Sequence, residues 1–214
     1  MIEIHFSKNK FQFEISILIV FSLNNQNKPN SGSHNVTFSN VVYIEKEDFN
    51  EDSPKGYRRL TKNQTVALKY AHVVLKFISK NADGSINCEA EPLTESNKPK
   101  AFIHWVSDKS AVDVKVNTYE RLFKSASPEA VAGGFLKDIA DNSKIVLDAK
   151  IDGYCLKDIQ ENINKTREST YKPVEKLVYQ FERNGYFVVD RQDSKKLGKI
   201  VFTRTVGLKE DKAK

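Results

Sequence analysis

The sequence predicts a mainly β protein with a few short helices. From Val36 onward, short runs of β-branched and aromatic residues are separated by turn-forming residues, which is typical of β-barrels and β-sandwiches. Residues 112–116 alternate strictly between valine and charged residues, so a strand there has one apolar and one wet face. Residues 81–84 supply turn chemistry between two such runs, with Gly84 free to adopt positive φ, and predict a hairpin.

Each expected strand is a run of β-forming residues bounded by polar or turn-forming residues. In chain order these runs are 41–44, 65–68, 72–79, 86–90, 102–106, 112–118, 144–151, 178–182, 186–189 and 199–203.

Helical patterns are few. Leu156, Ile159 and Ile163 recur at helical spacing and predict a helix over 156–165, and residues 127–129 resemble a helix start. The polar stretches are expected to be loops or a fraying tail. They are 95–100, 164–172 and 209–214.

The most apolar run of the chain lies near its N-terminus, at residues 15–21. It is far shorter than the ~20 residues of a membrane helix, Glu14 bounds its start, and no small-residue cleavage site follows. A buried β-strand is therefore expected rather than a signal peptide.

Composition indicates a folded protein with a bias toward polyanionic partners. Hydrophobic residues make up 39% and charged residues 29% of the chain, which argues against disorder. Lys plus Arg exceed Asp plus Glu by 34 − 28 = 6, and this excess favours partners such as nucleic acid. Cys88 and Cys155 match no metal-ligand spacing and fit a reduced, cytosolic setting.

The sequence contains no recognisable catalytic motif. A glycine-rich phosphate loop, a His/Cys metal cluster and a nucleophile set beside a base are all lacking from the pattern of residues. No catalytic or metal-binding residue is therefore assigned.

A basic segment with an aromatic residue inside it is the richest local feature. No acidic residue lies between Pro54 and Leu68, and Tyr57 sits among the cations. An arginine there can pair bidentately with phosphate or with a guanine edge, and Tyr57 can stack on a base. A solvated cationic loop is the alternative. The cations are Lys55, Arg58, Arg59, Lys62 and Lys69.

The strand expected at 178–182 is a second candidate, because alternation puts Gln180 and Glu182 on one face and Phe181 on the other. A glutamine reads a base edge with its donor and its acceptor. Spacing alone, however, favours an ordinary exposed strand face with a charge pair. At 103–105 a packed tryptophan beside a hydrogen-bonded histidine is expected rather than a ligand site.

Together these segments resemble the C-terminal anticodon-binding region of glutaminyl-tRNA synthetases over about residues 24–211. The residues that carry the resemblance are 24–29, 43–49, 56–60, 98–107, 119–123, 133–136, 180–187 and 204–211. The segments 103–107 and 180–183 favour the glutamine enzyme over its glutamate relative. Residues 98–100, 133–134 and 208–211 look more eukaryotic than bacterial.

The resemblance implies two β-barrels along the anticodon arm of a tRNA, whose loop bases are splayed into separate pockets. It implies that Gln180 reads the middle uridine of the anticodon, with Glu182 as its orienting partner, and that Arg59 faces a guanine at the third position. The remaining implied loop contacts are Arg58, Lys69 and Asn27. The sequence departs from the bacterial pattern at Ala67, where an arginine serves the wobble base, so the wobble assignment stays open.

The expected domains follow from the same resemblance. One barrel, nearer the catalytic domain, is expected to combine residues 24–47 with 116–208, and the second to span 48–115. Residues 1–23 form an N-terminal extension of unknown status that resembles nothing familiar, and 209–214 a charged tail.

The expected partners are glutamine tRNA and the catalytic domain of the synthetase, in the cytoplasm and without a membrane, and other synthetases in a complex are left open. The resemblance implies that the full enzyme uses ATP and magnesium. Its adenylate-binding signatures, the His-Ile-Gly-His and Lys-Met-Ser-Lys-Ser types, are lacking here, where the only methionine is Met1. The alternative function is a protein-interaction or scaffold module that keeps the barrels and no longer reads tRNA selectively.

Overall fold

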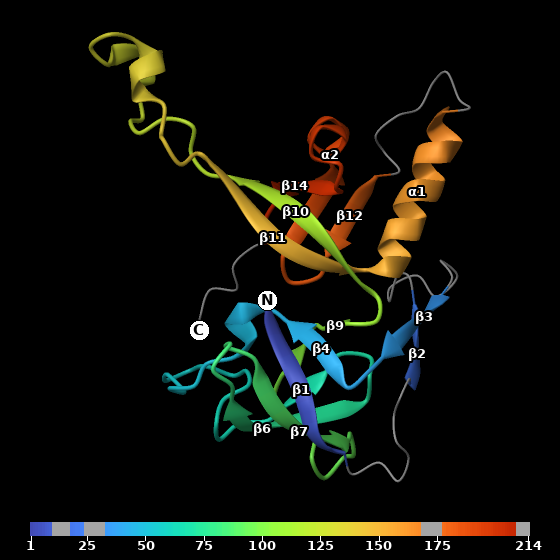
Figure 1. Cartoon of the computed structure of the whole chain (residues 1–214). Coiled ribbons are helices and arrows are strands. Elements are labelled where there is room, and N and C mark those ends of the chain that lie inside the picture. Colours follow the sequence, from blue (N-terminus) through green and yellow to red (C-terminus); the bar gives the residue numbers. More distant parts are fainter. Residues whose placement is uncertain (10–17, 24–32, 168–176, 209–214) are drawn as a thin grey trace. The chain divides into compact units, whose positions relative to one another are not determined.

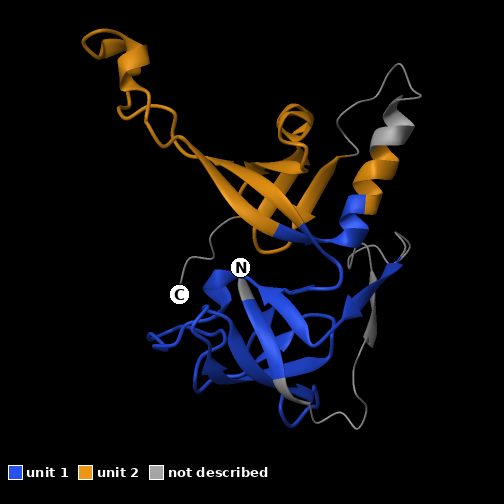
Figure 2. Cartoon of the chain, in the orientation of Figure 1, with its two compact units in different colours: residues 1–112, 150–156 blue, residues 113–149, 157–214 orange. Residues whose placement is uncertain are grey.

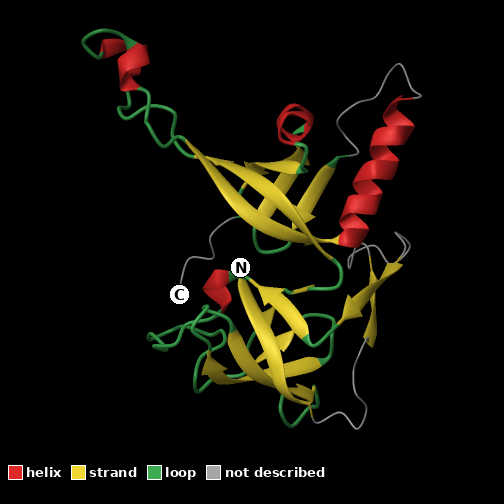
Figure 3. Ribbon diagram, viewed as in Figure 1, coloured by secondary structure: helices red, strands yellow, loops and turns green. Residues whose placement is uncertain are grey.

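Strands dominate the computed structural model (Figure 1), as the alternating runs predict. Two α-helices and short 3-10 turns complete the part of the chain that the structure describes (Figure 3), which confirms the mainly β fold class. The described residues are 1–9, 18–23, 33–167 and 177–208. The two compact units (Figure 2) are residues 1–112 with 150–156, and residues 113–149 with 157–214.

The first unit is built on a seven-stranded sheet with the order β8-β5-β6-β7-β1-β4-β9. Strand β1 pairs in parallel with β7 and antiparallel with β4. A separate ribbon pairs β2 with β3. The strands are β1 (Ile2–Asn9), β2 (Leu18–Leu23), β3 (Ser33–Phe38), β4 (Val41–Ile44), β5 (Val66–Leu68), β6 (Val73–Lys80), β7 (Ile86–Pro92), β8 (Phe102–Ile103) and β9 (Val106–Ser107).

The predicted hairpin at 81–84 is confirmed between β6 and β7. Gly84 adopts a φ of 88°, which a side chain would strain. The Asp83 carboxylate accepts hydrogen bonds from the Ser85 amide at 2.9 Å and from its hydroxyl at 2.7 Å. The Asn81 amide donates to the Ser85 carbonyl at 2.8 Å. These bonds fix the register in which Lys80 faces Ile86.

Aromatic rings pack against one another in the core of the first unit. Phe38 is 1% exposed, stacks on Phe6 with ring centroids 5.4 Å apart, and meets the edge of Trp105 at 5.2 Å. The Trp105 indole nitrogen donates to the Lys69 carbonyl at 2.9 Å, and His104 Nδ1 lies 3.8 Å from Glu45 Oε1. The packed tryptophan predicted at 103–105 is confirmed. Residues 104–105 also divide the strand predicted at 102–106 into β8 and β9.

The second unit contains a five-stranded sheet with the order β11-β10-β14-β13-β12. The predicted alternation in 112–116 is confirmed, since Val114 and Val116 are buried and Asp113 is exposed. The elements that complete the described chain are β10 (Ala111–Tyr119), β11 (Lys144–Asp152), β12 (Val178–Phe181), β13 (Gly185–Val189), β14 (Val201–Val206), α1 (Gly153–Arg167), α2 (Arg191–Leu197) and the 3-10 turns η2 (Lys46–Asp48), η3 (Pro128–Ala130) and η4 (Phe135–Asp138).

The helices differ from the prediction. Helix α1 begins earlier than residue 156, because Asp152 Oδ1 accepts a hydrogen bond from the Tyr154 amide at 2.8 Å and caps it. It also continues through residue 167, so residues 164–167 are not the loop that their polarity suggested. At 127–129 only the short turn η3 forms, because the chain becomes extended at Val131, with φ −73° and ψ 134°.

Helix α2 and strands β1 and β3 were not predicted, although the two ends of α2 carry sequence signals. Asp190 caps α2 by accepting a hydrogen bond from the Asp193 amide at 2.9 Å, and Gly198 ends it in the left-handed conformation. Of the strand expected at 15–21, residues 18–21 lie in β2 and the rest lie outside the described residues. In that described part no helix is long and apolar enough to cross a membrane.

The predicted grouping of residues 24–47 with 116–208 stays a prediction. In this structure β4 pairs with β1 and β9 and so belongs to the first sheet.

Gly185 lies where β13 meets β14 and generates a first prediction. Its φ is 131°, and a Cβ built on it would lie 2.4 Å from the Val206 carbonyl oxygen. Gly185→Ala should therefore lower the free energy of unfolding by about 2–3 kcal/mol, measured by urea unfolding. Gly207→Ala is the matched control, because no atom lies within 4 Å of its Cβ position. Equal unfolding midpoints for the two variants would refute this account of the β13–β14 contact.

Candidate nucleic-acid interface

The basic segment of the first unit forms a loop held by its own backbone. The Tyr57 amide donates to the Pro54 carbonyl at 3.0 Å, and Gly56 takes the positive φ of 86° that such a turn requires at its third position. The half-buried Tyr57 donates its hydroxyl to the Glu47 carbonyl at 2.8 Å. Arg58, next in the chain, is exposed, and no ion pair of its side chain occurs among the described residues. The loop therefore presents Arg58 to solvent on a fixed backbone.

Among the described residues, Arg59, unlike Arg58, forms an ion pair with a buried residue. One guanidinium nitrogen donates to the carboxylate of Asp48, whose side chain is fully buried, while 37% of the Arg59 side chain is exposed. The Arg59 carbonyl accepts a hydrogen bond from Gln64 Nε2. A guanidinium has five N–H donors, so an arginine held at one end retains donors for a base or phosphate at the other. The ion pair with Asp48 therefore fixes the orientation of the Arg59 guanidinium.

The other cations of the segment are partly engaged. Lys62 pairs with Glu51 at 2.9 Å, and this hydrogen bond lowers the pKa of Glu51. Lys69 is half-buried, and its ammonium lies 5.2 Å from the centre of the Tyr70 ring. Ala67 is fully buried, so position 67 offers no side chain to a wobble base.

Gln180 lies on the outer face of β12, as alternation predicted. The neighbouring Phe181 turns to the other face, where its ring meets Phe187 at 4.7 Å and Phe202 at 5.0 Å. Gln180 is exposed, and its amide has no hydrogen-bond partner among the described residues. Glu182 is exposed in the turn that follows. This arrangement leaves one acceptor and two donors of Gln180 available to a base edge.

Beside Gln180 lies a tyrosine that the sequence analysis missed. Tyr186 is the cross-strand partner of Gln180, and Val206 is the partner of Tyr186 on β14. Tyr186 is 41% exposed and Val206 60% exposed. Alternation on β13 was the signal, because the two residues that flank Tyr186 are buried.

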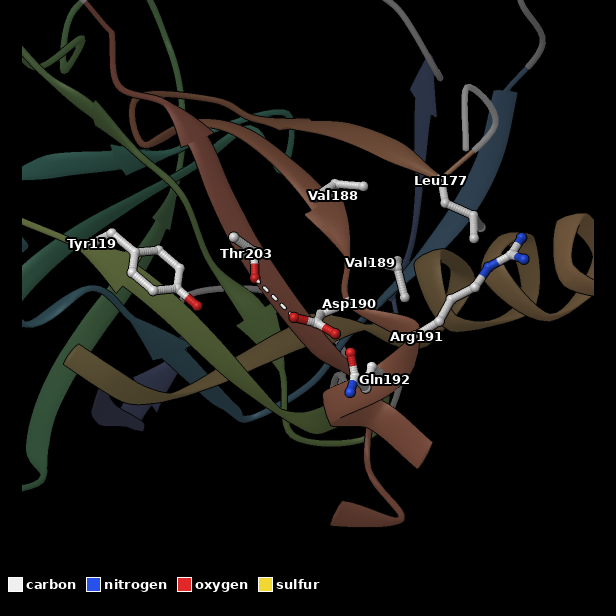
Figure 4. A pocket seen from close by; sticks show the side chains of 8 residues that line it. All are labelled: Tyr119, Leu177, Val188, Val189, Asp190, Arg191, Gln192 and Thr203. Carbon is white, nitrogen blue, oxygen red and sulfur yellow. Dashed lines mark hydrogen bonds between the residues drawn. The ribbon is translucent and has the colours of Figure 1, made fainter. Parts of the chain in front are cut away.

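A cavity of about 390 Å³ adjoins this sheet (Figure 4). Val188 and Thr203, which are cross-strand partners, line it from the strands, and the residues that start α2 also line it. Asp190 is engaged there, since it accepts a hydrogen bond from Thr203 Oγ1 at 3.4 Å. The lining residues are Tyr119, Leu177, Val188, Val189, Asp190, Arg191, Gln192 and Thr203.

No cofactor or metal site is assigned. Over residues 1–9, 18–23, 33–167 and 177–208, no group of three or more His, Cys, Asp or Glu side chains is placed to hold a metal ion. Burial raises the pKa of the Cys88 thiol to about 12, so this cysteine is not a nucleophile near neutral pH.

The structure brings part of the predicted site together. Tyr57, Arg58 and Arg59 share one loop, and Lys69 lies elsewhere in the same unit. In the second unit, Gln180 and Glu182 are neighbours on and after β12. Asn27 lies outside the described residues. The RNA contacts assigned to these residues stay predictions.

Comparison with known proteins agrees with the resemblance found in the sequence. Residues 9–91 and 102–190 each match a family model described as tRNA synthetases class I (E and Q), anti-codon binding domain. A probable glutamine–tRNA ligase of Drosophila melanogaster is 38% identical over 195 residues, which is 87% of this chain and 23% of the relative. One of Caenorhabditis elegans is 41% identical over 187 residues, covering 83% and 21%.

A bacterial relative is similar to the same part of the chain. The glutamine–tRNA ligase of Buchnera aphidicola subsp. Schizaphis graminum is 37% identical over 188 residues, which is 84% of this chain and 32% of the relative. The chain therefore spans about a fifth to a third of the length of these relatives.

The ion pair of Asp48 generates a second prediction. Arg59→Ala leaves a buried carboxylate without this cation, so it should lower the free energy of unfolding by about 1–3 kcal/mol in urea unfolding. Arg58→Ala is the matched control and should change it by less than about 0.5 kcal/mol. If both substitutions lowered the free energy of unfolding by the same small amount, the ion pair with Asp48 would not be what holds Arg59.

Proposed function

The chain belongs to the anticodon-binding domain family of the class I tRNA synthetases for glutamate and glutamine, and from this premise we propose that it binds the anticodon loop of glutamine tRNA and reads its bases. The relatives named above are glutamine–tRNA ligases, which supports glutamine over glutamate. The observation that carries the proposal is Gln180, an exposed glutamine on β12 whose amide has no partner among the described residues.

The chemistry of Gln180 suits a uridine. Its carbonyl accepts a hydrogen bond and its NH₂ group donates two, which complements a base edge that carries an imide N–H between two carbonyls. Glu182 follows two positions later and is proposed to orient the amide. The strand beneath is fixed by the contacts of Phe181 with Phe187 and Phe202.

The basic loop is proposed to act with the strand on the same RNA. Arg59 presents a guanidinium whose position Asp48 fixes, which favours bidentate recognition of a guanine edge. Arg58 and Lys69 are proposed to contact the phosphate backbone, which positions the loop without reading its sequence.

We further propose that ligation, with its ATP and magnesium, belongs to parts of the intact protein outside this chain, and that the chain works beside a catalytic domain in the cytoplasm. The chain covers only 21–32% of the relatives named above, which supports this division of labour. Association with other synthetases rests on the sequence resemblance alone.

A titration of the purified chain with anticodon stem-loops tests the proposal. We expect the native loop to bind more tightly than a copy whose middle uridine is replaced, by about 1–3 kcal/mol, and Gln180→Ala to remove this preference. Gln192→Ala, an exposed glutamine of the same unit, should keep it. Equal affinity of the wild-type chain for both loops would rule out base reading by Gln180.

The salt dependence of binding provides a separate prediction for Arg58. Removing one cation that neutralises a phosphate should reduce the slope of log K against log salt by about 0.7–0.9, because fewer counterions are released. Arg58→Ala should show this reduction and keep the preference for the middle uridine. Lys76→Ala, an exposed cation on β6, should leave the slope unchanged. An unchanged slope for Arg58→Ala would show that Arg58 does not bind phosphate.

A further inference from the structure

We infer that Tyr186 is a stacking residue that holds the base read by Gln180, so that the outer face of β12 and β13 forms a complete nucleobase subsite. This inference rests on the proposed function and extends it. The subsite supplies two kinds of contact to one base. Gln180 addresses the polar edge of the base, and Tyr186 addresses its flat face.

The register of the strands carries the inference. Gln180 and Tyr186 are direct partners in the antiparallel pair of β12 and β13. Side chains of such partners leave the same face with Cβ atoms about 4.5–5.5 Å apart. A base that stacks on the Tyr186 ring therefore has its edge within reach of the Gln180 amide.

The exposure of this face indicates a ligand surface rather than core packing. Tyr186 is 41% exposed, whereas its neighbours Gly185 and Phe187 are buried. Its hydroxyl has no hydrogen-bond partner in the described part of the chain. Val206 beside it on β14 is 60% exposed, and Val178 on β12 is 49% exposed. An aromatic ring among exposed apolar side chains, next to an amide with no hydrogen-bond partner among the described residues, offers both contacts that single-stranded RNA readers use.

Local contacts hold the backbone of Tyr186 in place. Gly185 lets the Val206 carbonyl approach closely, and the Thr205 hydroxyl donates to the Tyr186 carbonyl at 3.0 Å. Beneath the strand, Phe187 contacts Phe181. On such a fixed backbone the tyrosine has only its few side-chain rotations to lose on binding, which favours stacking.

The test compares Tyr186→Ala with the wild-type chain on two anticodon stem-loops, one native and one with an abasic middle nucleotide. Loss of stacking should weaken binding of the native loop roughly 5- to 150-fold. It should not weaken binding of the abasic loop, which has no base to stack. Tyr186→Phe should retain native affinity, and Phe135→Ala, which removes an exposed ring elsewhere in the unit, should bind both loops normally.

Tyr186→Leu keeps an apolar side chain on the strand without an aromatic face, and it replaces Tyr186→Ala in the same comparison if the alanine variant does not fold. Equal weakening on the native and abasic loops would overturn the inference by showing a structural role. Unchanged binding, with the middle-uridine preference intact, would overturn it and leave the proposed function standing. Absence of any such preference in the wild-type chain would refute the proposed function together with this inference.

Discussion

The two-residue period of a β-strand is the constraint on which the recognition surface depends. In β12 and β13 alternate side chains turn toward the packed face, so only the intervening positions are available to a ligand. In β12 and β13 the buried set contains Phe187 and the half-buried Phe181, and the outward set contains Gln180 and Tyr186. Packing of the inner rings therefore sets the geometry of the outer contacts. A slip of one residue would exchange the two sets.

In the first unit, an ion pair rather than apolar packing fixes the position of a candidate RNA-binding side chain. Asp48 is fully buried, and Arg59 reaches it from the surface loop. A buried carboxylate is costly without a partner, so the pair holds the guanidinium in one place. Arg58, one position earlier, is exposed and unconstrained by such a pair among the described residues. Adjacent arginines are thus suited to different tasks, one to a defined base edge and the other to backbone phosphate.

Much of this architecture was accessible from the sequence, because strand periodicity is local information. The strands at 41–44 and 86–90, the hairpin at 81–84 and the outward position of Gln180 all follow from alternation and turn chemistry. Ion pairs are not local, and nothing near Arg59 in the sequence points to Asp48 as its partner. The turn between β12 and β13 was not predicted, so Tyr186 was not placed opposite Gln180 until the register of this pair was known. The cap of α2 was visible in Asp190, but its short helix has little periodicity.

Strand β1 pairs in parallel with β7, which the ribosome synthesises much later. Ile4 faces Ile86, 86 − 4 = 82 residues later in the sequence. At a synthesis rate of about 5–20 residues per second, β1 leaves the ribosome roughly 4–16 seconds before its partner exists. During that interval one edge of β1 has no native strand beside it, and long-range pairings of this kind fold slowly. Translation speed through residues 10–92 therefore sets how long the nascent chain carries an exposed strand edge.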